Sequence, residues 1–408
     1  MFARRTNWNL TANAYTRAIE EHRLANRELL DLTASNPTTV GLHYDEDKLL
    51  RALANPQALT YDPSPKGLLS AREAIADYYA ERGIQIPPDD LILTTSTSEG
   101  YTFLFRLLCE PGDAVLVPTP SYPLFDFLAD LQDVKLVPYE LVYDHGWQID
   151  FHSLESVLRD QNDKGSGGGA KCKAILVVHP NNPTGSFVKP AEAAQLARFC
   201  AKNNLAIIAD EVFLDYSLKT PDSGAVAAPS FASRLDADSS QALTFTLSGL
   251  SKIVALPQMK VAWIAVSGPD SLKREALNRL EIIADTYLSM NAPVQWAIQA
   301  MLEERVDIQR QLIARIQANL AELDRQLAGQ TLCARLQVEG GWYVILRVPV
   351  TGSDEELAIS LLRSTGVLVQ PGHFYDFARD GYLVLSLITP QEVFVPGIER
   401  LLCFFAEA

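Results

Sequence analysis

The stretch that decides the fold is Ala174–Gly185, with the sequence AILVVHPNNPTG. Its first half is an apolar run typical of a buried strand, and the run leads into a polar turn that contains Asn182. Two more apolar runs follow, LAIIA directly before Asp210 and LTFTL shortly before Lys252. Because ligands bind at the carboxyl ends of the strands in an open parallel sheet, the sequence predicts that these three side chains meet in one crevice.

Each of these side chains also has an ordinary interpretation. Asn182 alone indicates a turn, Asp210 alone a helix-capping acid and Lys252 alone a surface lysine. Together, in this order, they meet the needs of pyridoxal phosphate, since an aspartate keeps a pyridine nitrogen protonated and a lysine forms an imine with an aldehyde. The sequence therefore predicts a pyridoxal phosphate site.

Strand and helix patterns alternate along much of the chain, which predicts an α/β fold with a mostly parallel, doubly wound sheet. A helix pattern covers Leu68–Glu81, for example, and a strand pattern follows at Leu91–Thr94. The expected strands are Leu91–Thr94, Ala114–Val117, Val134–Val137, Ala174–Val178, Leu205–Ala209, Leu243–Leu247 and Val261–Val266.

The length of 408 residues exceeds what one hydrophobic core normally supports, so two domains are expected. We expect residues 1–45 to form an N-terminal arm and part of a small α+β domain, and residues 46–290 to form the large cofactor-binding domain. Residues 291–408 complete the small domain, beginning with a linker helix. A long helical pattern without proline or glycine at Val294–Ala328 supports that linker.

Composition and charge limit the possible partners and the location. The net charge of −15 argues against nucleic-acid binding, which needs clustered lysine and arginine. No apolar run approaches the ~18 residues of a membrane span, and no apolar segment follows the basic residues near Met1, so we expect neither a membrane anchor nor a secretion signal. The five cysteines are scattered, and Cys109, Cys200 and Cys403 fall in apolar helical patterns. Buried free thiols and a cytoplasmic location are therefore expected.

Four further segments strengthen the cofactor prediction. They are Tyr61–Gly67 with the helix pattern after it, Thr94–Gly100, Pro118–Pro123 and Gly340–Tyr343. With the three strand ends, they resemble, nearly from end to end, the fold-type I pyridoxal phosphate enzymes of the class I/II aminotransferase group, the aspartate aminotransferase-like family. The resemblance implies a seven-stranded sheet in the large domain and transfer of an amino group from an amino donor to an oxo acid by a ping-pong mechanism.

The resemblance also implies roles for individual residues. Lys252 would bond the cofactor and move the substrate proton, Asp210 would pair with the pyridinium nitrogen, and Asn182 would donate to O3′ of the ring. Tyr122 would stack on the ring. The phosphate would be held by Ser96, Thr97, Ser98 and Lys260, and by Tyr61 of the neighbouring subunit, which implies a homodimer.

The chain departs from the family pattern at several positions. Lys260 stands where an arginine is usual and keeps the charge without the planar fork. Phe213 stands where a tyrosine is usual, Gly249 where a serine is frequent, and Thr97 where glycine is common. The largest departure is Val384, at the position of the arginine that binds the substrate α-carboxylate. A bidentate arginine is the strongest carboxylate ligand available, and valine cannot replace it.

Two kinds of replacement are open at the substrate. A loop cation, with Arg379 as the first candidate, or backbone donors near Asn36 and Gly41 would bind the carboxylate. Otherwise the substrate has a masked or absent α-carboxylate. Alternatives to transamination also remain, because the same cofactor serves β-lyases and decarboxylases, and a catalytically retired protein could keep it as a ligand. Intact Lys252, Asp210 and Asn182 favour the aminotransferase, with a small-molecule amino donor and oxo acceptor.

Overall fold

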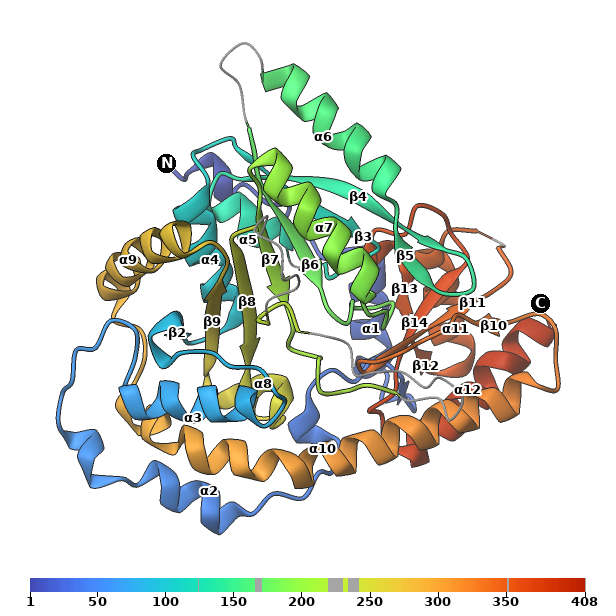
Figure 1. The fold of residues 1–408 in the computed structure, drawn as a ribbon. Coiled ribbons are helices and arrows are strands. Elements are labelled where there is room, and N and C mark those ends of the chain that lie inside the picture. The colour runs from blue at the N-terminus through green and yellow to red at the C-terminus, as the bar shows by residue number, and fades with distance from the viewer. Residues whose placement is uncertain (124, 166–170, 219–229, 234–241, 351, 408) are drawn as a thin grey trace.

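The computed structural model describes residues 1–123, 125–165, 171–218, 230–233, 242–350 and 352–407 (Figure 1). Its centre is an eight-stranded sheet with the strand order β2-β9-β8-β7-β6-β3-β4-β5. In that order the strands are Leu91–Thr94, Ala262–Ser267, Thr244–Gly249, Ala206–Asp210, Cys172–Val178, Ala114–Thr119, Lys135–Tyr143 and Trp147–Ile149.

The five strands β8, β7, β6, β3 and β4 are parallel to one another, and β9 is antiparallel to both strands beside it. All seven strands predicted from the sequence are present, which confirms the mostly parallel α/β fold. The eighth strand, β5, is a short addition that pairs antiparallel with the end of β4, where the rings of Tyr143 and Trp147 pack edge to face.

Helices cover both faces of this sheet because side chains along each strand alternate between two cores. Ile208 packs on the face with α4 and α9, whereas Ile207 packs on the face with α6 and α7. A third core lies under β2 and β9 and involves α3, α8 and the first part of α10. These helices, with α5 and α2, are α2 Glu46–Leu53, α3 Leu69–Ala80, α4 Thr97–Leu108, α5 Phe125–Leu131, α6 Phe151–Gly165, α7 Pro190–Asn203, α8 Leu250–Ile253, α9 Asp270–Tyr287 and α10 Ala292–Leu327.

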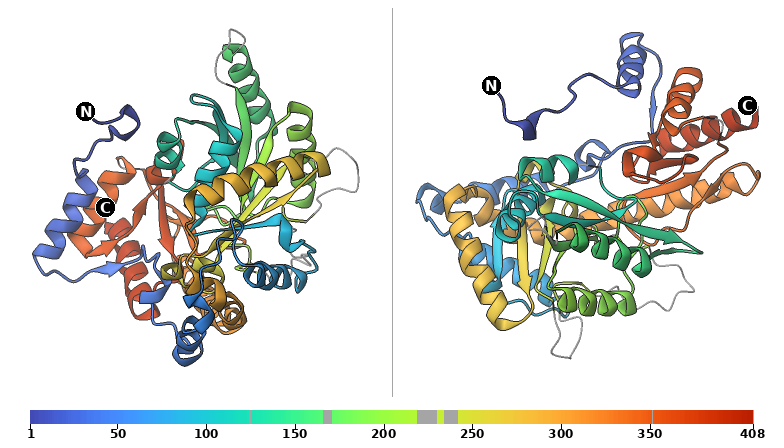
Figure 2. Two further views of the ribbon diagram at one scale, coloured as in Figure 1. Left: turned by 90° about the vertical axis from the view of Figure 1, so that its left-hand side faces the viewer. Right: turned by 90° about the horizontal axis from the view of Figure 1, so that it is seen from above.

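A second, antiparallel sheet is formed by the C-terminal part of the chain, in the strand order β10-β11-β14-β13. The N-terminal part joins it, since β1 pairs with β12 and α1 contacts α11. Figure 2 shows the N-terminal helix, in blue, beside the C-terminal region, in red. The elements of this region are α1 Ala14–Leu24, β1 Leu30–Asp31, β10 Ala334–Arg335, β11 Tyr343–Arg347, α11 Asp354–Thr365, β12 Val367–Leu368, β13 Gln370–Pro371, β14 Tyr382–Ser386 and α12 Gln391–Glu407.

The long helix α10 packs against both parts of the molecule. Its first turns contribute Val294 and Met301 to the core under β2 and β9, and its last turns contribute Ile316 and Leu323 to the core of the second sheet. Buried Asn319 donates its amide hydrogens to the carbonyl oxygens of Leu387 and Thr389. The helix thus occupies the place expected of the linker, while the exact domain boundaries stay a prediction.

Short 3-10 turns complete the described chain and lie mainly at connections. They are η1 Arg4–Thr6, η2 Pro37–Thr39, η3 Pro56–Leu59, η4 Pro88–Asp90, η5 Pro257–Met259 and η6 Gly372–Tyr375.

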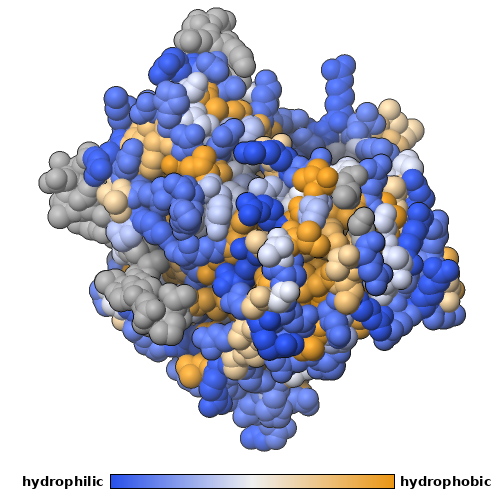
Figure 3. All heavy atoms as spheres, turned by 90° about the vertical axis from the view of Figure 1, so that its right-hand side faces the viewer, coloured by the Kyte–Doolittle hydropathy of each residue, from blue (hydrophilic) through white to orange (hydrophobic). Residues whose placement is uncertain are grey.

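Among the described helices, none has the length and apolar character needed to cross a membrane. On the side that carries β5, α12 and the C-terminus in Figure 1, the surface is largely hydrophilic with hydrophobic residues grouped near its middle (Figure 3). All five cysteines are free thiols. Cys200 is buried as expected, but the prediction for Cys403 is wrong, because α12 turns that side chain to the surface.

Candidate active site

The three predicted strand ends meet at a cavity of about 440 Å³. Strands β6, β7 and β8 are neighbours in the sheet, and their register pairs Val178 with Asp210 and Asp210 with Leu247. Asn182 and Lys252, which follow β6 and β8, therefore reach the same opening. The lining residues are Ser35, Thr97, Ser98, Tyr101, Tyr122, Pro123, Phe125, Leu128, Val178, Asn182, Asp210, Val212, Phe213, Ser251, Lys252, Tyr343, Gln370 and Tyr375.

A tight turn after β6 fixes Asn182. The backbone N–H of Gly185 donates to the carbonyl of Asn181, and the hydroxyl of Thr184 donates to the Asn181 side chain at 3.0 Å. Glycine is required at 185, because φ is +67° and a Cβ there would lie 2.5 Å from the carbonyl oxygen of Gly340. The result is a buried Asn182 whose Oδ1 has no hydrogen-bond partner.

Asp210 is a buried carboxylate with two donors. The hydroxyl of Tyr101 donates to Oδ2 at 2.8 Å, and the backbone N–H of Val212 donates to Oδ1 at 3.1 Å. Burial raises the pKa of Asp210, and these two hydrogen bonds together with the charge of Lys252 act against that rise. The site thus holds an acid whose charge depends on specific neighbours.

Lys252 lies on α8 with its ammonium between aromatic rings. Nζ is 4.6 Å from the ring centroid of Trp342 and 5.3 Å from that of Phe213. Burial lowers the pKa of Lys252 to about 8, and the nearby Asp210 opposes this shift. The hydroxyl of Tyr216 donates to the backbone carbonyl of Lys252 at 2.6 Å, which anchors the short helix.

Helix α4 begins at the edge of the cavity, where Thr97 and Ser98 line it. The hydroxyl of Ser96 does not line the cavity; it accepts a hydrogen bond from the N–H of Glu99 and caps the helix. The free N–H groups in the first turn of a helix attract anions. Tyr122 lies across the opening, is 38% exposed and packs edge to face on Phe125.

The structure does not bring every predicted residue to this cavity. Lys260 is exposed, with a left-handed backbone at φ 53°, and Tyr61 is 74% exposed beside a different depression. The side chain of Asn36 caps η2 by accepting from Thr38, and Gly41 is exposed. Arg379 is exposed in the loop after η6. None of these five predicted residues lines the cavity in the single chain.

The lining also includes residues that were not among the predicted site residues, such as Ser35, Tyr101, Tyr343, Gln370 and Tyr375. Tyr101 had a local signal, because it lies one helical turn after Thr97 on the same face of α4. The other four residues lie at the cavity because segments that are distant in the sequence pair with one another. Ser386 of β14, for example, donates from its backbone N–H to Leu32 and from its hydroxyl to Ala34, which places Ser35 at the opening.

The residues present suit pyridoxal phosphate. The buried carboxylate of Asp210 suits a pyridinium nitrogen, the amide N–H₂ of Asn182 suits the O3′ oxygen as a donor, and the amine of Lys252 beside aromatic rings suits an aldehyde. The first turn of α4 offers donors to a phosphate at the other end. The cavity therefore has a partner for each polar part of the cofactor.

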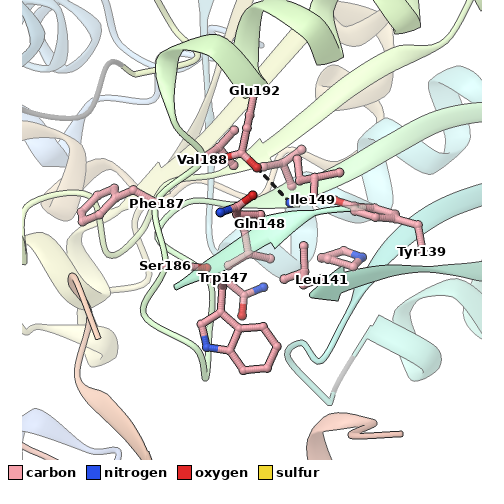
Figure 4. A pocket seen from close by; sticks show the side chains of 13 residues that line it. Tyr139, Leu141, Trp147, Gln148, Ile149, Ser186, Phe187, Val188 and Glu192 are labelled. Atoms are coloured by element: carbon pink, nitrogen blue, oxygen red, sulfur yellow. Dashed lines mark hydrogen bonds between the residues drawn. The ribbon is translucent and has the colours of Figure 1, made fainter. Parts of the chain in front are cut away.

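A smaller cavity nearby has no such chemistry. It measures about 20 Å³ and lies between the β4–β5 hairpin and the segment before α7 (Figure 4). Its carboxylate, Glu192, points toward β5 and accepts a hydrogen bond from the N–H of Ile149 at 2.9 Å (Figure 4). It also accepts from the N–H of Lys189 at 2.9 Å. With that carboxylate satisfied, we interpret this cavity as a packing feature.

The sequence and the fold are both similar to those of known proteins. Residues 8–393 match the family model of aminotransferase class I and II. The chain is 31% identical to the glutamate-pyruvate aminotransferase AlaA of Haemophilus influenzae, over 88% of this chain and 86% of that protein. It is 28% identical to the alanine aminotransferase of Mycobacterium tuberculosis strain H37Rv, over 91% of this chain and 84% of that one.

Among solved structures, the alanine aminotransferase from Pyrococcus furiosus has the same fold, with a TM-score of 0.86 and 21% identity over the whole of both chains. The family match spans the sheet, the cavity and α10, so it covers every element that builds the site. The chain belongs to the aminotransferase class I and II family and is a pyridoxal phosphate-dependent enzyme that moves an amino group from an amino donor to an oxo acid.

Proposed function

We propose that Lys252 and Asp210 are the catalytic residues of this aminotransferase. The observation that carries the proposal is the position of Lys252, whose amine is enclosed in the cavity close enough to Asp210 for their charges to interact. Lys252 would hold the cofactor through its amine. When that amine is free, Nζ would take the proton from the substrate Cα.

The pKa of Lys252 suits this proton transfer. An ordinary lysine is almost fully protonated near neutral pH and is a poor base. Burial lowers the pKa of Lys252 to about 8, so an appreciable fraction of its amine is free near neutral pH. A base whose pKa lies near the working pH is the efficient one.

Pyridoxal phosphate, when bound, supplies an electron sink for the electrons left on Cα. Asp210 supports this by keeping its own negative charge next to the ring nitrogen, with Tyr101 and Val212 as donors to the carboxylate. Asn182 would donate to O3′ of the ring and Tyr122 would stack on the ring, since both side chains line the cavity. The first turn of α4, beginning at Thr97, binds the phosphate.

We further propose a homodimer located in the cytoplasm. In the single chain, the side chain of Tyr61 is largely exposed to solvent, which is unusual for a large aromatic residue. It also lies away from the cavity that holds Lys252. Its place is explained if the partner subunit's Tyr61 completes the phosphate site. Lys260 then adds a positive charge at the same phosphate site.

Curated relatives act, by their names, on alanine or on glutamate and pyruvate. These compounds are the first donors and acceptors to test here, alongside donors with other groups in place of the α-carboxylate. The test is a donor panel with the purified holoenzyme, in which absorbance reports conversion of the cofactor to its amine form. Release of pyruvate or ammonia without that conversion would instead support lyase chemistry.

Reduction with borohydride followed by peptide mapping tests the residue assignment. We expect the label on Lys252, loss of turnover in Lys252→Ala, and unchanged turnover in the control Lys202→Ala, a lysine exposed at the end of α7. A label on another lysine would remove Lys252 from the proposal. Asp210→Asn should fold normally and lose several orders of magnitude in turnover, because a neutral side chain no longer favours the protonated ring nitrogen.

A further inference from the structure

The helix that carries Lys252 is a single turn. Helix α8 covers four residues, Leu250–Ile253, and lies against α10 (Figure 1). A helix of this length is not stable by itself, and the last carbonyl groups of a helix lack partners inside it. At its start, the N–H of Leu250 donates to the carbonyl of Val261 at 3.0 Å. The position of Lys252 therefore depends on contacts made by other parts of the chain.

Side chains from three other segments bind carbonyl groups at the C-terminal end of α8. Besides the bond from Tyr216 described above, Nε2 of Gln309 donates to the carbonyl of Ile253 at 2.8 Å. The hydroxyl of Tyr44 donates to the carbonyl of Ala255 at 2.9 Å. Tyr216 follows β7, Gln309 belongs to α10 and Tyr44 precedes α2. Three separate segments thus fix the end of the helix that carries the lysine.

The backbone is strained just after α8. Ala255 is fully buried and has a left-handed backbone, with φ of 53°. This conformation is unfavourable for a residue with a side chain, so surrounding contacts have to hold it. The N–H of Leu256 donates back to the carbonyl of Leu250 at 3.2 Å, and Tyr44 binds the carbonyl of Ala255. The bond from Tyr44 therefore acts at a strained position three residues after Lys252.

Tyr44 itself lies between the two parts of the molecule. Its ring packs against the core of the second sheet and against the core under β2 and β9. Burial raises the pKa of Tyr44 to about 12, so the hydroxyl keeps its proton near neutral pH and remains a donor. The hydroxyl thus ties the end of α8 to a ring that is held on both sides.

Gln309 is held in place by a buried ionic network. Its Nε2 also donates to Oδ2 of Asp215 at 2.6 Å, so both hydrogens of this nitrogen have acceptors. The carboxylate of Asp215, which is 3% exposed, also accepts from the hydroxyl of Tyr78 at 3.0 Å and pairs with Arg82. The orientation of the Gln309 amide is therefore fixed by groups outside α8.

We propose that Tyr44 and Gln309 are positioning residues of the amino-group exchange, which hold the end of α8 and thereby keep Nζ of Lys252 in the cavity. Neither residue is among the described residues that line the cavity, so both act through α8. Without their bonds, α8 moves more freely and Nζ spends less time beside Asp210 and the ring of Trp342. This inference rests on the proposed role of Lys252 and adds the residues that fix its place.

Tyr44→Phe removes the hydroxyl and keeps the ring that packs against both cores. We expect kcat to fall about three- to tenfold, the range that corresponds to the loss of one neutral hydrogen bond. KM should change less than about twofold, because the residues that line the cavity stay the same. Tyr139→Phe is the matched control, since that hydroxyl also donates to a backbone carbonyl at 2.9 Å, the carbonyl of Leu176. An unchanged kcat in Tyr44→Phe, or the same fall in both variants, would contradict the inference.

Hydrogen exchange of the full-length protein, with cofactor and without it, gives an answer that does not depend on turnover. We expect the backbone amides of residues 250–256 to exchange about three- to tenfold faster in Tyr44→Phe than in the wild type. The amides of β6 should keep their exchange rates in this variant. Exchange at residues 250–256 that stays at the wild-type rate would mean that Tyr44 does not hold α8.

The pH dependence of cofactor recombination reports where Nζ lies. Burial lowers the pKa of Lys252 to about 8, and the charge of Asp210 opposes this shift. Burial raises the pKa of the tyrosine hydroxyls that line the cavity, so these stay neutral near pH 8: Tyr101, Tyr122, Tyr343 and Tyr375. A loosened α8 exposes Nζ to water, so the midpoint in Tyr44→Phe should move to higher pH, toward the value of 10.5 for an ordinary lysine. A purely structural role of Tyr44 would lower the unfolding temperature and leave this midpoint unchanged, which would contradict the inference.

Gln309→Met tests the second donor, since methionine has a similar length and no N–H. We expect the same direction of change in kcat and the same faster exchange at residues 250–256. Gln326→Met is its control, because the amide of Gln326 donates from a later turn of α10 to the carbonyl of Val395 at 3.2 Å. Equal effects of both methionine variants on the exchange of α8 would indicate a general loosening of α10 and contradict the inference.

Borohydride peptide mapping of Tyr44→Phe separates failure of this inference from failure of the proposed function. A label on Lys252, with wild-type exchange and an unchanged midpoint, would overturn the inference and leave the proposed function standing. A label on another lysine would overturn the proposed function and the inference with it. A label on Lys252, faster exchange at the end of α8 and a midpoint at higher pH are the results we expect.

Discussion

The hydroxyl of Tyr101 donates a hydrogen bond to Oδ2 of Asp210 over 2.8 Å, and both side chains are buried. This bond joins the first turns of α4 to the end of β7, two elements that contribute to the same cavity. It also makes the charge of Asp210 depend on a residue from another element.

Tyr101→Phe should therefore raise the pKa of Asp210. The bond from Tyr101 stabilises the carboxylate, and a hydrogen bond to a charged group contributes about 1.5–3 kcal/mol, or roughly one to two pKa units. We expect the acid limb of the pH profile of kcat/KM to move to higher pH. Tyr139→Phe is the control, since its buried hydroxyl donates to the carbonyl of Leu176 instead. An unchanged acid limb in Tyr101→Phe would show that Asp210 does not limit activity in this way.

The lowered pKa of Lys252 should appear in the stability of the cofactor-free protein. Its folded pKa of about 8 is below the value of 10.5 for a free lysine. Between these values the unfolded chain binds a proton that the folded chain lacks, so this group makes stability rise with pH. We expect Lys252→Met to be more stable than wild type near pH 7 and to lose part of that advantage by pH 9.5. Denaturant unfolding at several pH values measures the free energy of unfolding of both proteins, and the contributions of other titrating groups cancel in the difference. A difference that does not change with pH would contradict the lowered pKa of Lys252.

Trp342 should help to keep Lys252 protonated. Its ring lies 4.6 Å from Nζ, and a cation–π contact contributes about 0.5–2 kcal/mol to the charged form. Trp342→Leu should therefore lower the pKa of Lys252 further, whereas Trp342→Phe, which retains a ring, should change it less. The pH dependence of cofactor recombination with the cofactor-free protein reports this pKa, because only the free amine reacts with an aldehyde. The same midpoint in both variants would rule out a role for the ring.

A mixed dimer should reveal whether Tyr61 acts across the interface. We expect Tyr61→Ala and Lys252→Ala homodimers to be impaired, the second completely. In a heterodimer of the two variants, one site combines intact Lys252 with the partner subunit's Tyr61. Refolding the variants together should then restore activity at about half of the sites in each heterodimer, as expected when two subunits share each site. If the refolded mixture is never more active than the Tyr61→Ala protein alone, Tyr61 does not act at the partner subunit's site.

The sequence by itself determined the large sheet and the centre of the site. Most of its seven predicted strands are buried apolar runs, and neighbouring parallel strands bring their carboxyl ends to one edge of the sheet. Asn182, Asp210 and Lys252 could therefore be predicted to meet, since each follows such a run. Thr97 and Tyr122 also line the cavity, as the local motifs indicated.

Only the tertiary structure decided the rest. The strand β5 was too short for a pattern, and Tyr101 gave no sign of its partner, 109 residues away. The side of the cavity that carries Ser35 and Gln370 depends on β13 pairing with β14 and on the N-terminal segment reaching Ser386, a contact that spans 352 residues between Ala34 and Ser386. Hydrophobic periodicity records which side of an element is buried, but it does not record which distant element covers it. For that reason the sequence predicted the side chains that follow the strands of the large sheet, whereas only the fold showed which residues of the second sheet line the same cavity.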